Sequence, residues 1–136
     1  MPITKELTIR VENSAGSLGR ICGTLADRGV NITAFQSIPS EKTILVCFVV
    51  DNAEAAKAVL DAEKTTYSEG EVVQVKLDHV PGELARAAAK LGKANININY
   101  AYCGVEPATN APIVVFGVTD VGRAVTILDR AAVASA

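Results

Sequence analysis

One turn sequence decides the fold: Asn13-Ser14-Ala15-Gly16-Ser17-Leu18, which leads through a single amphipathic segment to Gly29-Val30-Asn31-Ile32. The same arrangement returns as His79-Val80-Pro81-Gly82-Glu83-Leu84 and leads to Asn95-Ile96-Asn97-Ile98. The two copies keep a constant offset of 66 residues, as the glycines Gly16 and Gly82 show. An offset that holds through a turn, a helix and the next strand indicates an internal repeat. Two copies are too few for a solenoid, so they predict two similar small domains in one polypeptide.

The composition is that of a folded protein without a membrane segment. The chain has 136 residues, of which 49% are hydrophobic and 21% charged, and its formal net charge is −2. The slight negative charge argues against a nucleic-acid partner, because phosphate backbones attract basic patches. An odd number of cysteines without a C-x-x-C pair indicates a reducing compartment. The longest apolar run, Ile44 to Val50, is far shorter than the ~20 residues of a membrane helix, so we expect a cytoplasmic protein with no membrane contact.

Hydrophobic periodicity predicts the same order of elements in both copies. In the first copy, apolar residues alternate with polar ones as in a half-buried strand, and the next apolar residues recur at i, i+3, i+4 and i+7 as in a helix. Either Asn13 or Ser14 is placed to cap that helix, and Gly29 to end it. Either Asp51 or Asn52 is placed to cap a second helix. The predicted strands of the first copy cover residues 7–11, 31–38, 44–50 and 65–68.

This order, β-α-β-β-α-β, is that of the ferredoxin-like split βαβ unit. The sequence therefore predicts an α+β protein with two ferredoxin-like βαββαβ units in tandem, each with an antiparallel sheet and its helices on one face. The only linker candidate is Glu69-Gly70-Glu71, so we expect one domain at residues 1–69 and another at 70–136. The tail after Arg130 is short, so the last strand of the second unit is missing or supplied from elsewhere.

No catalytic constellation is present in the sequence. Because His79 is the only histidine, a Cys/His metal cluster cannot form within one chain. The glycines at 16, 19 and 23 match neither G-x-G-x-x-G nor a P-loop. Neither His79 nor Cys103 has a partner at a recognisable catalytic spacing. We therefore expect a protein that is not an enzyme, with no catalytic residue, no metal site and no cofactor.

The remaining chemical feature is a glycine turn that opens a helix, present twice. The first N–H groups of a helix lack partners and attract anions, and glycine lets a ligand approach the backbone. An ordinary tight turn is the alternative, but two copies favour a binding site. We expect Asn13 and Asn31 to be neighbours, because both flank the first helix of a β-α-β unit. Their amides, with the helix N-terminus, would suit the carboxylate and ammonium groups of an α-amino acid.

These residues resemble a known family. The pattern Ile9-x-Val11-x-Asn13-x-x-Gly16-x-Leu18, ending in Gly29-Val30-Asn31-Ile32, is similar to that of the ACT domain. So is the pattern Val75-x-Leu77-x-His79-x-Pro81-Gly82-x-Leu84, ending in Asn97-Ile98. ACT domains are small βαββαβ regulatory modules that bind amino acids. The resemblance covers nearly the whole chain and points to the small stand-alone proteins with two ACT domains.

The resemblance implies which residues contact the ligand. In the family these are the turn residue before x-P-G and the asparagine of N-I, which correspond to Asn13 and Asn31 in the first copy. The corresponding residues of the second copy are His79 and Asn97. The ligand-binding set that we predict comprises Asn13, Ser14, Ala15, Gly16, Ser17, Leu18, Asn31, Ile32, His79, Val80, Pro81, Gly82, Glu83, Leu84, Asn97 and Ile98.

Three residues depart from the family pattern. Ala15 replaces the usual proline, so the first turn is less rigid. His79 stands where Asp or Asn is usual, which affects the choice of ligand. Asn95 replaces the usual glycine after the helix, and asparagine also tolerates the left-handed conformation.

The resemblance implies a regulatory function. It predicts a non-enzymatic amino-acid-binding protein of amino acid metabolism that acts by allosteric regulation, with the ligand near ACT–ACT interfaces. The expected partners are a small amino acid, a second copy of the chain in a homodimer and a regulated metabolic enzyme.

Two alternative functions share this order of elements. An RNA-binding module of RRM topology needs stacking aromatics on its central strands, which correspond to residues 44–50 and 113–118 and lack that pattern. A small enzyme on a dimeric ferredoxin-like fold would require His79 or Cys103 to be catalytic.

Overall fold

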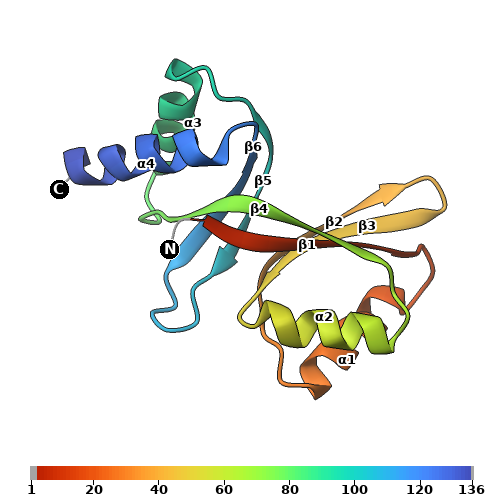
Figure 1. Ribbon diagram of the computed structural model, residues 1–136. Helices are drawn as coiled ribbons and strands as arrows, with labels where there is room; N and C mark the ends of the chain where they lie inside the picture. Colours follow the sequence, from red (N-terminus) through yellow and green to blue (C-terminus); the bar gives the residue numbers. More distant parts are fainter. Residues whose placement is uncertain (1–2, 136) are drawn as a thin grey trace. The chain divides into compact units, whose positions relative to one another are not determined.

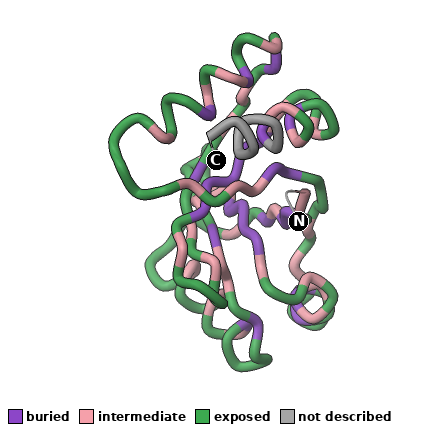
Figure 2. Tube along the Cα trace, turned by 90° about the vertical axis from the view of Figure 1, so that its left-hand side faces the viewer, coloured by how far each residue is buried: buried purple, intermediate pink, exposed green. Residues whose placement is uncertain are grey.

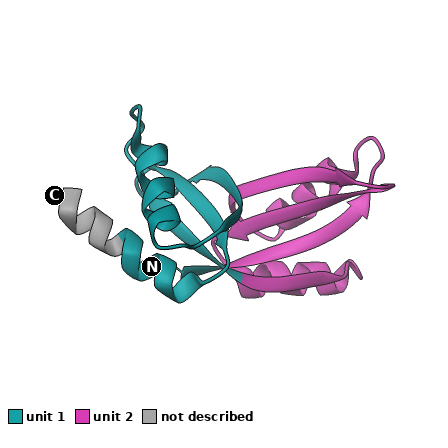
Figure 3. Cartoon of the chain, turned by 90° about the horizontal axis from the view of Figure 1, so that it is seen from above, with its two compact units in different colours: residues 1–4, 71–136 teal, residues 5–70 magenta. Residues whose placement is uncertain are grey.

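The computed structural model describes residues 3–135, with side-chain surroundings as far as Leu128. The chain divides into two compact units, shown in Figure 3. We call residues 5–70 the N-terminal unit (magenta) and residues 1–4 and 71–136 the C-terminal unit (teal).

The N-terminal unit contains three paired strands, two helices and the beginning of a fourth strand (Figure 1). The central strand pairs antiparallel with both of its neighbours, so that Phe48 lies opposite Leu7 on one side and Phe35 on the other. In chain order the elements are β1 (Ile3–Glu12), α1 (Ser17–Asp27), β2 (Ile32–Ser40), β3 (Thr43–Val50), α2 (Ala53–Ala62) and β4 (Tyr67–Lys76), and β3 is the central strand.

The C-terminal unit repeats this arrangement after the second half of β4. Its elements are α3 (Glu83–Lys93), β5 (Ile98–Val105), β6 (Pro112–Val118) and α4 (Val121–Ser135). Strand β6 pairs antiparallel with both β4 and β5, as β3 does with β1 and β2. The predicted α+β class with antiparallel sheets is therefore confirmed.

Each unit packs its two helices on one face of its own strands. In the N-terminal unit the buried residues of β1 and β3 meet those of α1 and α2 in one hydrophobic core, and in the C-terminal unit those of β4 and β6 meet α3 and α4 in another. A phenylalanine with only 1% of its surface exposed, Phe48 or Phe116, lies in each core. Figure 2 shows the buried positions alternating with half-buried and exposed ones along the chain.

The predicted helix ends are largely confirmed. Gly29 follows α1 with φ +73°, and Asn95 follows α3 with φ +61°, so both residues adopt the left-handed conformation. Asn52 caps α2, since its side chain accepts a hydrogen bond from the Ala55 N–H at 3.0 Å. The prediction that Asn13 or Ser14 caps α1 is wrong, because Gly16 is the N-cap and no side chain caps this helix.

The linker prediction is also wrong. Glu69-Gly70-Glu71 lies inside β4, which continues from Tyr67 to Lys76 without a loop. The acidic residues mimic a linker, but Glu69 is bound by two lysines, with Lys57 Nζ at 2.8 Å and Lys5 Nζ at 3.9 Å. The hydrogen bond from Lys57 is the main cause that lowers the pKa of Glu69. A polar stretch can thus stay in a strand when neighbouring elements supply the counter-charges.

We expect Asn52→Ala to lower the free energy of unfolding by about 1 kcal/mol, because the α2 N-terminus loses its side-chain acceptor. Urea denaturation followed by circular dichroism measures this loss. Asn99→Ala is the control, since this exposed asparagine lies within β5 and a surface substitution there should change stability by less than about 0.5 kcal/mol. Equal effects of the two substitutions would contradict the capping role.

Candidate functional site

The two glycine turns have the same backbone geometry. Gly16 follows the end of β1 with φ +86°, and Gly82 follows β4 and its turn with φ +94°. Each glycine carbonyl accepts the first helical hydrogen bond, from Arg20 N–H and Arg86 N–H respectively, both at 2.9 Å. A residue with a Cβ rarely adopts these angles, so glycine is required for the chain to enter the helix in this way.

Both helix N-termini lack a side-chain cap. No side chain hydrogen-bonds to the first N–H groups of α1 or α3. In the first turn the hydroxyls of Ser14 and Ser17 bind one another at 2.7 Å, and in the second Glu83 Oε1 pairs with Arg86 Nη1 at 2.9 Å. A Cβ built on Gly16 or Gly82 would meet no atom within 4 Å, so the space beside each glycine is open. The first N–H group of each helix bonds to a backbone carbonyl, Ser17 N–H to Ser14 at 3.2 Å and Glu83 N–H to Val80 at 3.4 Å, so an anion can approach the N–H groups of the residues that follow.

The predicted site residues of the turns lie largely at the surface. Asn13, Ser14, Ala15 and Gly16 are exposed, and so are their counterparts His79, Val80, Pro81 and Gly82. The helix-entry residues Ser17, Leu18 and Glu83 are half-buried, whereas Leu84 is 52% exposed. We call residues 13–18 and 79–84 the glycine-turn patches.

The asparagines of the second predicted patch precede β2 and β5. Asn31 and Asn97 have exposed side chains, and Ile32 and Ile98 are half-buried. The backbone of Asn31 is fixed by Asp51, which accepts the Asn31 N–H on its Oδ1 and donates its own N–H to the Asn31 carbonyl, both at 3.0 Å. The Asn97 carbonyl accepts the Thr119 N–H at 3.3 Å. We call Asn31–Ile32 and Asn97–Ile98 the asparagine edges.

The expected proximity of Asn13 and Asn31 is wrong. Strand β3 pairs Thr43 with Glu12 at one end and Val50 with Ile32 at the other. These two pairs are seven residues apart along β3. At about 3.3 Å per residue, the end of β1 and the start of β2 therefore lie roughly 23 Å apart. Helix α1 returns the chain to the edge of the sheet where β1 begins, so β2 starts at the end opposite to the glycine turn. One small ligand cannot touch both asparagines of the same unit.

The C-terminal unit separates its two patches in the same way. Strand β6 pairs Ile113 with Lys76, just before the glycine turn, and Val118 with Ile98, just after Asn97. Each unit thus offers two patches at opposite ends of its sheet.

The candidate nucleophiles of the chain differ in their burial. Burial raises the pKa of the Cys22 and Cys47 thiols, which disfavours their reactive thiolate forms. Cys103 and His79 are exposed, the former on β5 and the latter in the second glycine turn. Among the side chains described as far as Leu128, no group of three or more His, Cys, Asp and Glu residues could hold a metal ion.

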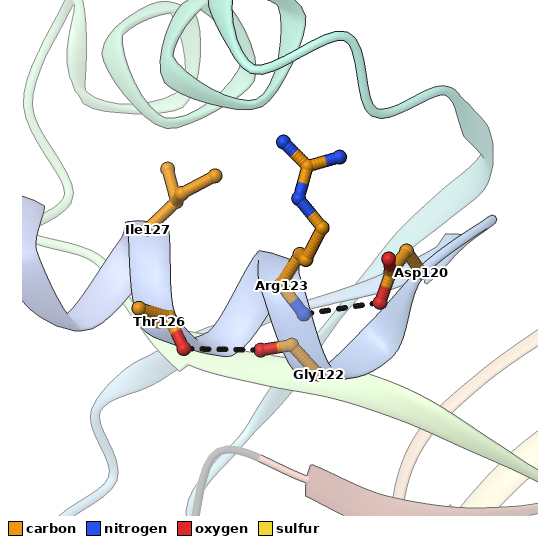
Figure 4. A pocket seen from close by; sticks show the side chains of 5 residues that line it. All are labelled: Asp120, Gly122, Arg123, Thr126 and Ile127. Carbon is orange, nitrogen blue, oxygen red and sulfur yellow. Dashed lines mark hydrogen bonds between the residues drawn. The ribbon is translucent and has the colours of Figure 1, made fainter.

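Figure 4 shows a hollow at the start of α4. The side chains that line it cap and anchor this helix. Asp120 Oδ1 accepts the Arg123 N–H at 3.1 Å, and the Arg123 guanidinium donates to the Ala94 carbonyl at 2.9 Å. The Thr126 hydroxyl donates to the Gly122 carbonyl at 3.2 Å. The polar groups are engaged within the unit, and they fix α4 to the end of α3.

Sequence reasoning missed a cluster at the turn between β2 and β3. Arg10, Ser40, Glu41, Lys42 and Thr43 line an open hollow there, of about 650 Å³. The residues come from three strands and the β2–β3 turn, and they lie up to 33 positions apart in the chain. Comparison of charges across the 66-residue repeat is the signal that could have found them, since Lys76 and Glu106 replace Arg10 and Ser40 in the second copy.

Residues 5–65 match the family model of the ACT domain. This segment of the chain is similar to an ACT domain. The matched segment falls within the N-terminal unit and contains its glycine-turn patch and its asparagine edge.

Solved structures share the fold over nearly the whole chain. Protein BT0572 from Bacteroides thetaiotaomicron superposes with a TM-score of 0.84 at 22% identity, over 95% of this chain and 88% of that one. The ligand-free regulatory subunit of aspartate kinase from Thermus thermophilus gives a TM-score of 0.67 at 16% identity, over 96% and 93% of the two chains. The corresponding subunit from Thermus flavus gives 0.58 at 15% identity, over 96% and 93%.

None of the curated proteins matches this chain in sequence. Of the helices in residues 3–135, none has both the length and the apolar character that a membrane crossing requires.

Proposed function

We propose that this protein is a non-enzymatic regulator that binds a small amino acid through two ACT domains, residues 1–69 and 70–136. The observation that carries the proposal is the pair of uncapped helix N-termini behind Gly16 and Gly82, each open to an anion. The ACT match over residues 5–65 supports the first domain, and the repeat of its turn, strand order and helix packing supports the second. A regulatory role is consistent with the aspartate kinase regulatory subunits that share the fold.

The chemistry of the two patches suits an α-amino acid. Its carboxylate would accept the backbone N–H groups of a glycine-turn patch, where the positive end of the helix dipole favours negative charge. Its ammonium group would donate to the amide oxygen of Asn31 or Asn97, which is exposed in each unit. The residues that would contact the ligand are those of the glycine-turn patches and the asparagine edges.

Because the two kinds of patch are far apart within one unit, a complete ligand site needs residues from two ACT units. Since Asn13 and Asn31 lie at opposite ends of one sheet, the glycine turn that binds the carboxylate and the asparagine that binds the ammonium group belong to different ACT units. We propose that two copies of the chain contribute them, so that ligand binding favours a homodimer. Such a dimer could pass the signal to a metabolic enzyme, in the cytoplasm, by changing the surface that the enzyme contacts.

A thermal-shift screen of the twenty amino acids identifies the ligand, because a ligand at 100 times its Kd adds about 2.7 kcal/mol of stability. We then expect Asn13→Ala, Asn31→Ala, His79→Ala and Asn97→Ala to weaken binding by roughly tenfold to hundredfold, the cost of one hydrogen bond to a charged group. Titration calorimetry measures the loss. The His79 site should bind more tightly, since Pro81 stiffens its turn and lowers the ordering cost.

The exposed asparagine Asn99 provides the matched control. Asn99→Ala should bind like the wild type, and sedimentation of the same samples should show a ligand-dependent dimer. Wild-type affinity in all four site variants would place the ligand elsewhere and overturn the proposal. Unfolding of all four variants would show that these side chains are structural.

A further inference from the structure

Hydrogen bonds fix the side chain of Arg10, in the N-terminal unit, at the end of the β2–β3 hairpin. Its Nη1 donates hydrogen bonds to Ser40 Oγ and Thr43 Oγ1, both at 3.1 Å. The Thr43 hydroxyl donates in turn to the Ser40 carbonyl at 2.9 Å. These contacts orient the guanidinium over the hollow that the three residues line with Glu41 and Lys42.

The residues that line the hollow carry a net positive charge. Among the side chains described up to Leu128, Arg10 and Lys42 form no ion pair with a carboxylate. Glu41 is the single acidic residue of the lining, so two cations face one anion. Glu41 sits at the tip of the hairpin with φ +59°.

The C-terminal unit shows what occupies the equivalent place. Lys76, 66 residues after Arg10, forms an ion pair with Glu106, with Nζ 3.0 Å from Oε2. The Thr109 hydroxyl donates to the other carboxylate oxygen, Oε1, at 3.0 Å. These hydrogen bonds, from Lys76 first and Thr109 second, lower the pKa of Glu106. Glu106 stands 66 residues after Ser40, so one copy supplies the carboxylate that the other copy lacks.

We infer that the hollow formed by Arg10, Ser40, Lys42 and Thr43 binds the carboxylate of a small organic anion, in the place that Glu106 fills in the C-terminal unit. This site goes beyond the amino-acid site proposed above, because all its residues belong to one unit and none belongs to the glycine-turn patches or the asparagine edges.

The available donors fit a carboxylate. Because Arg10 uses Nη1 for the two hydroxyls, its Nη2 and Nε hydrogens remain for the ligand, and an arginine can bind both oxygens of a carboxylate at once. The Ser40 hydroxyl accepts from Arg10 and keeps its own hydrogen to donate. Lys42 adds a mobile ammonium group at the rim.

Amide chemical shifts in a titration with sodium succinate test the site, with sodium chloride used to keep the ionic strength constant. We expect saturable shifts at Arg10 and residues 40–43 of the wild type. Arg10→Gln should weaken succinate binding by about tenfold or more, since a charged hydrogen-bond donor is lost. Ser40→Glu should abolish it, because the new carboxylate would pair with Arg10 as Glu106 pairs with Lys76.

Ser37→Glu is the matched control, since it adds the same charge at an exposed position of the same strand, three residues earlier. This variant should bind succinate within about twofold of the wild type, because residue 37 lies on the opposite face of β2 from Ser40 and about 10 Å from it along the strand, about one Debye length at 0.1 M salt. Asn31→Ala should also bind succinate normally, because Asn31 lies at the opposite end of the sheet from the hollow, and this result separates the hollow from the amino-acid site. The amide spectrum and thermal midpoint of each variant verify its fold, and Ser40→Glu decides the outcome if Arg10→Gln unfolds.

Three results would overturn the inference. The first is a wild type without saturable shifts at the hairpin. The second is equal loss of binding in Ser37→Glu and Ser40→Glu, which would reveal only a general charge effect. The third is a response to inorganic phosphate without a response to succinate, which would show that the hollow selects another anion.

Discussion

Phe48→Ala is expected to lower the free energy of unfolding by about 3–5 kcal/mol. Phe48 is 1% exposed at the centre of the N-terminal core, opposite Leu7 of β1 and surrounded by residues of both helices. Removing its ring forfeits the transfer energy of the buried atoms and leaves a cavity that the close-packed neighbours fill only in part. Urea denaturation monitored by circular dichroism measures the change.

The chain supplies a matched control and a matched repeat for this substitution. Phe35 lies beside Phe48 across β2 and β3 but is 51% exposed, so Phe35→Ala should cost far less. Phe116 is the equivalent of Phe48 in the C-terminal core and is also 1% exposed, so Phe116→Ala should cost a similar amount. A loss below about 1 kcal/mol in Phe48→Ala, or an equal loss in Phe35→Ala, would contradict the core that the structure shows.

Gly117→Val is expected to lower the free energy of unfolding by about 3 kcal/mol, which is near the upper end of the losses caused by overpacking. Gly117 pairs with Tyr100 across β5 and β6, and the tyrosine ring lies directly over the glycine. A Cβ at this position would overlap the ring, which itself stacks on Tyr102 with a centroid distance of 6.3 Å and an interplanar angle of 3°. The ring must move away, and the stacked pair must separate, before any side chain fits.

A second substitution tests whether the loss of stability comes from the overlap with Tyr100 or from placing valine at this position of β6 in any context. Tyr100→Ala removes the ring, so the additional cost of Gly117→Val should fall well below its cost in the wild type. A double-mutant cycle measures this coupling. Gly92→Ala is the steric control, since a Cβ there meets nothing within 4 Å and alanine favours the helix by about 1 kcal/mol. Additive effects of the two substitutions at 100 and 117 would refute the contact.

Local chemistry allowed much of the fold to be predicted. The left-handed positions at Gly29 and Asn95 and the cap at Asn52 follow from residue types that suit those conformations, and the structure has them all. The repeat of turn, helix and strand also follows from the sequence, because each copy carries the same periodicity. Local signals sufficed wherever the partner of a residue lay within a few positions along the chain.

The errors arose where pairing between distant segments decides the outcome. Glu69 resembles a linker residue until Lys57 and Lys5 are brought to it by α2 and β1. The distance between Asn13 and Asn31 depends on the direction in which α1 returns the chain, which side-chain chemistry does not reveal. The Arg10 cluster escaped notice for the same reason, because Ser40 and Thr43 lie 30 and 33 residues away.

Strand β4 has a practical consequence for dissecting the protein. Its first residue, Tyr67, packs against the N-terminal core, whereas Val73 is part of the C-terminal core. The sequence alone would suggest dividing the chain near residue 70, but a cut there would split this strand. Each fragment would then keep only part of β4, with unpaired backbone groups that favour aggregation. Fragments meant to be studied alone should therefore overlap, with both retaining residues 67–76.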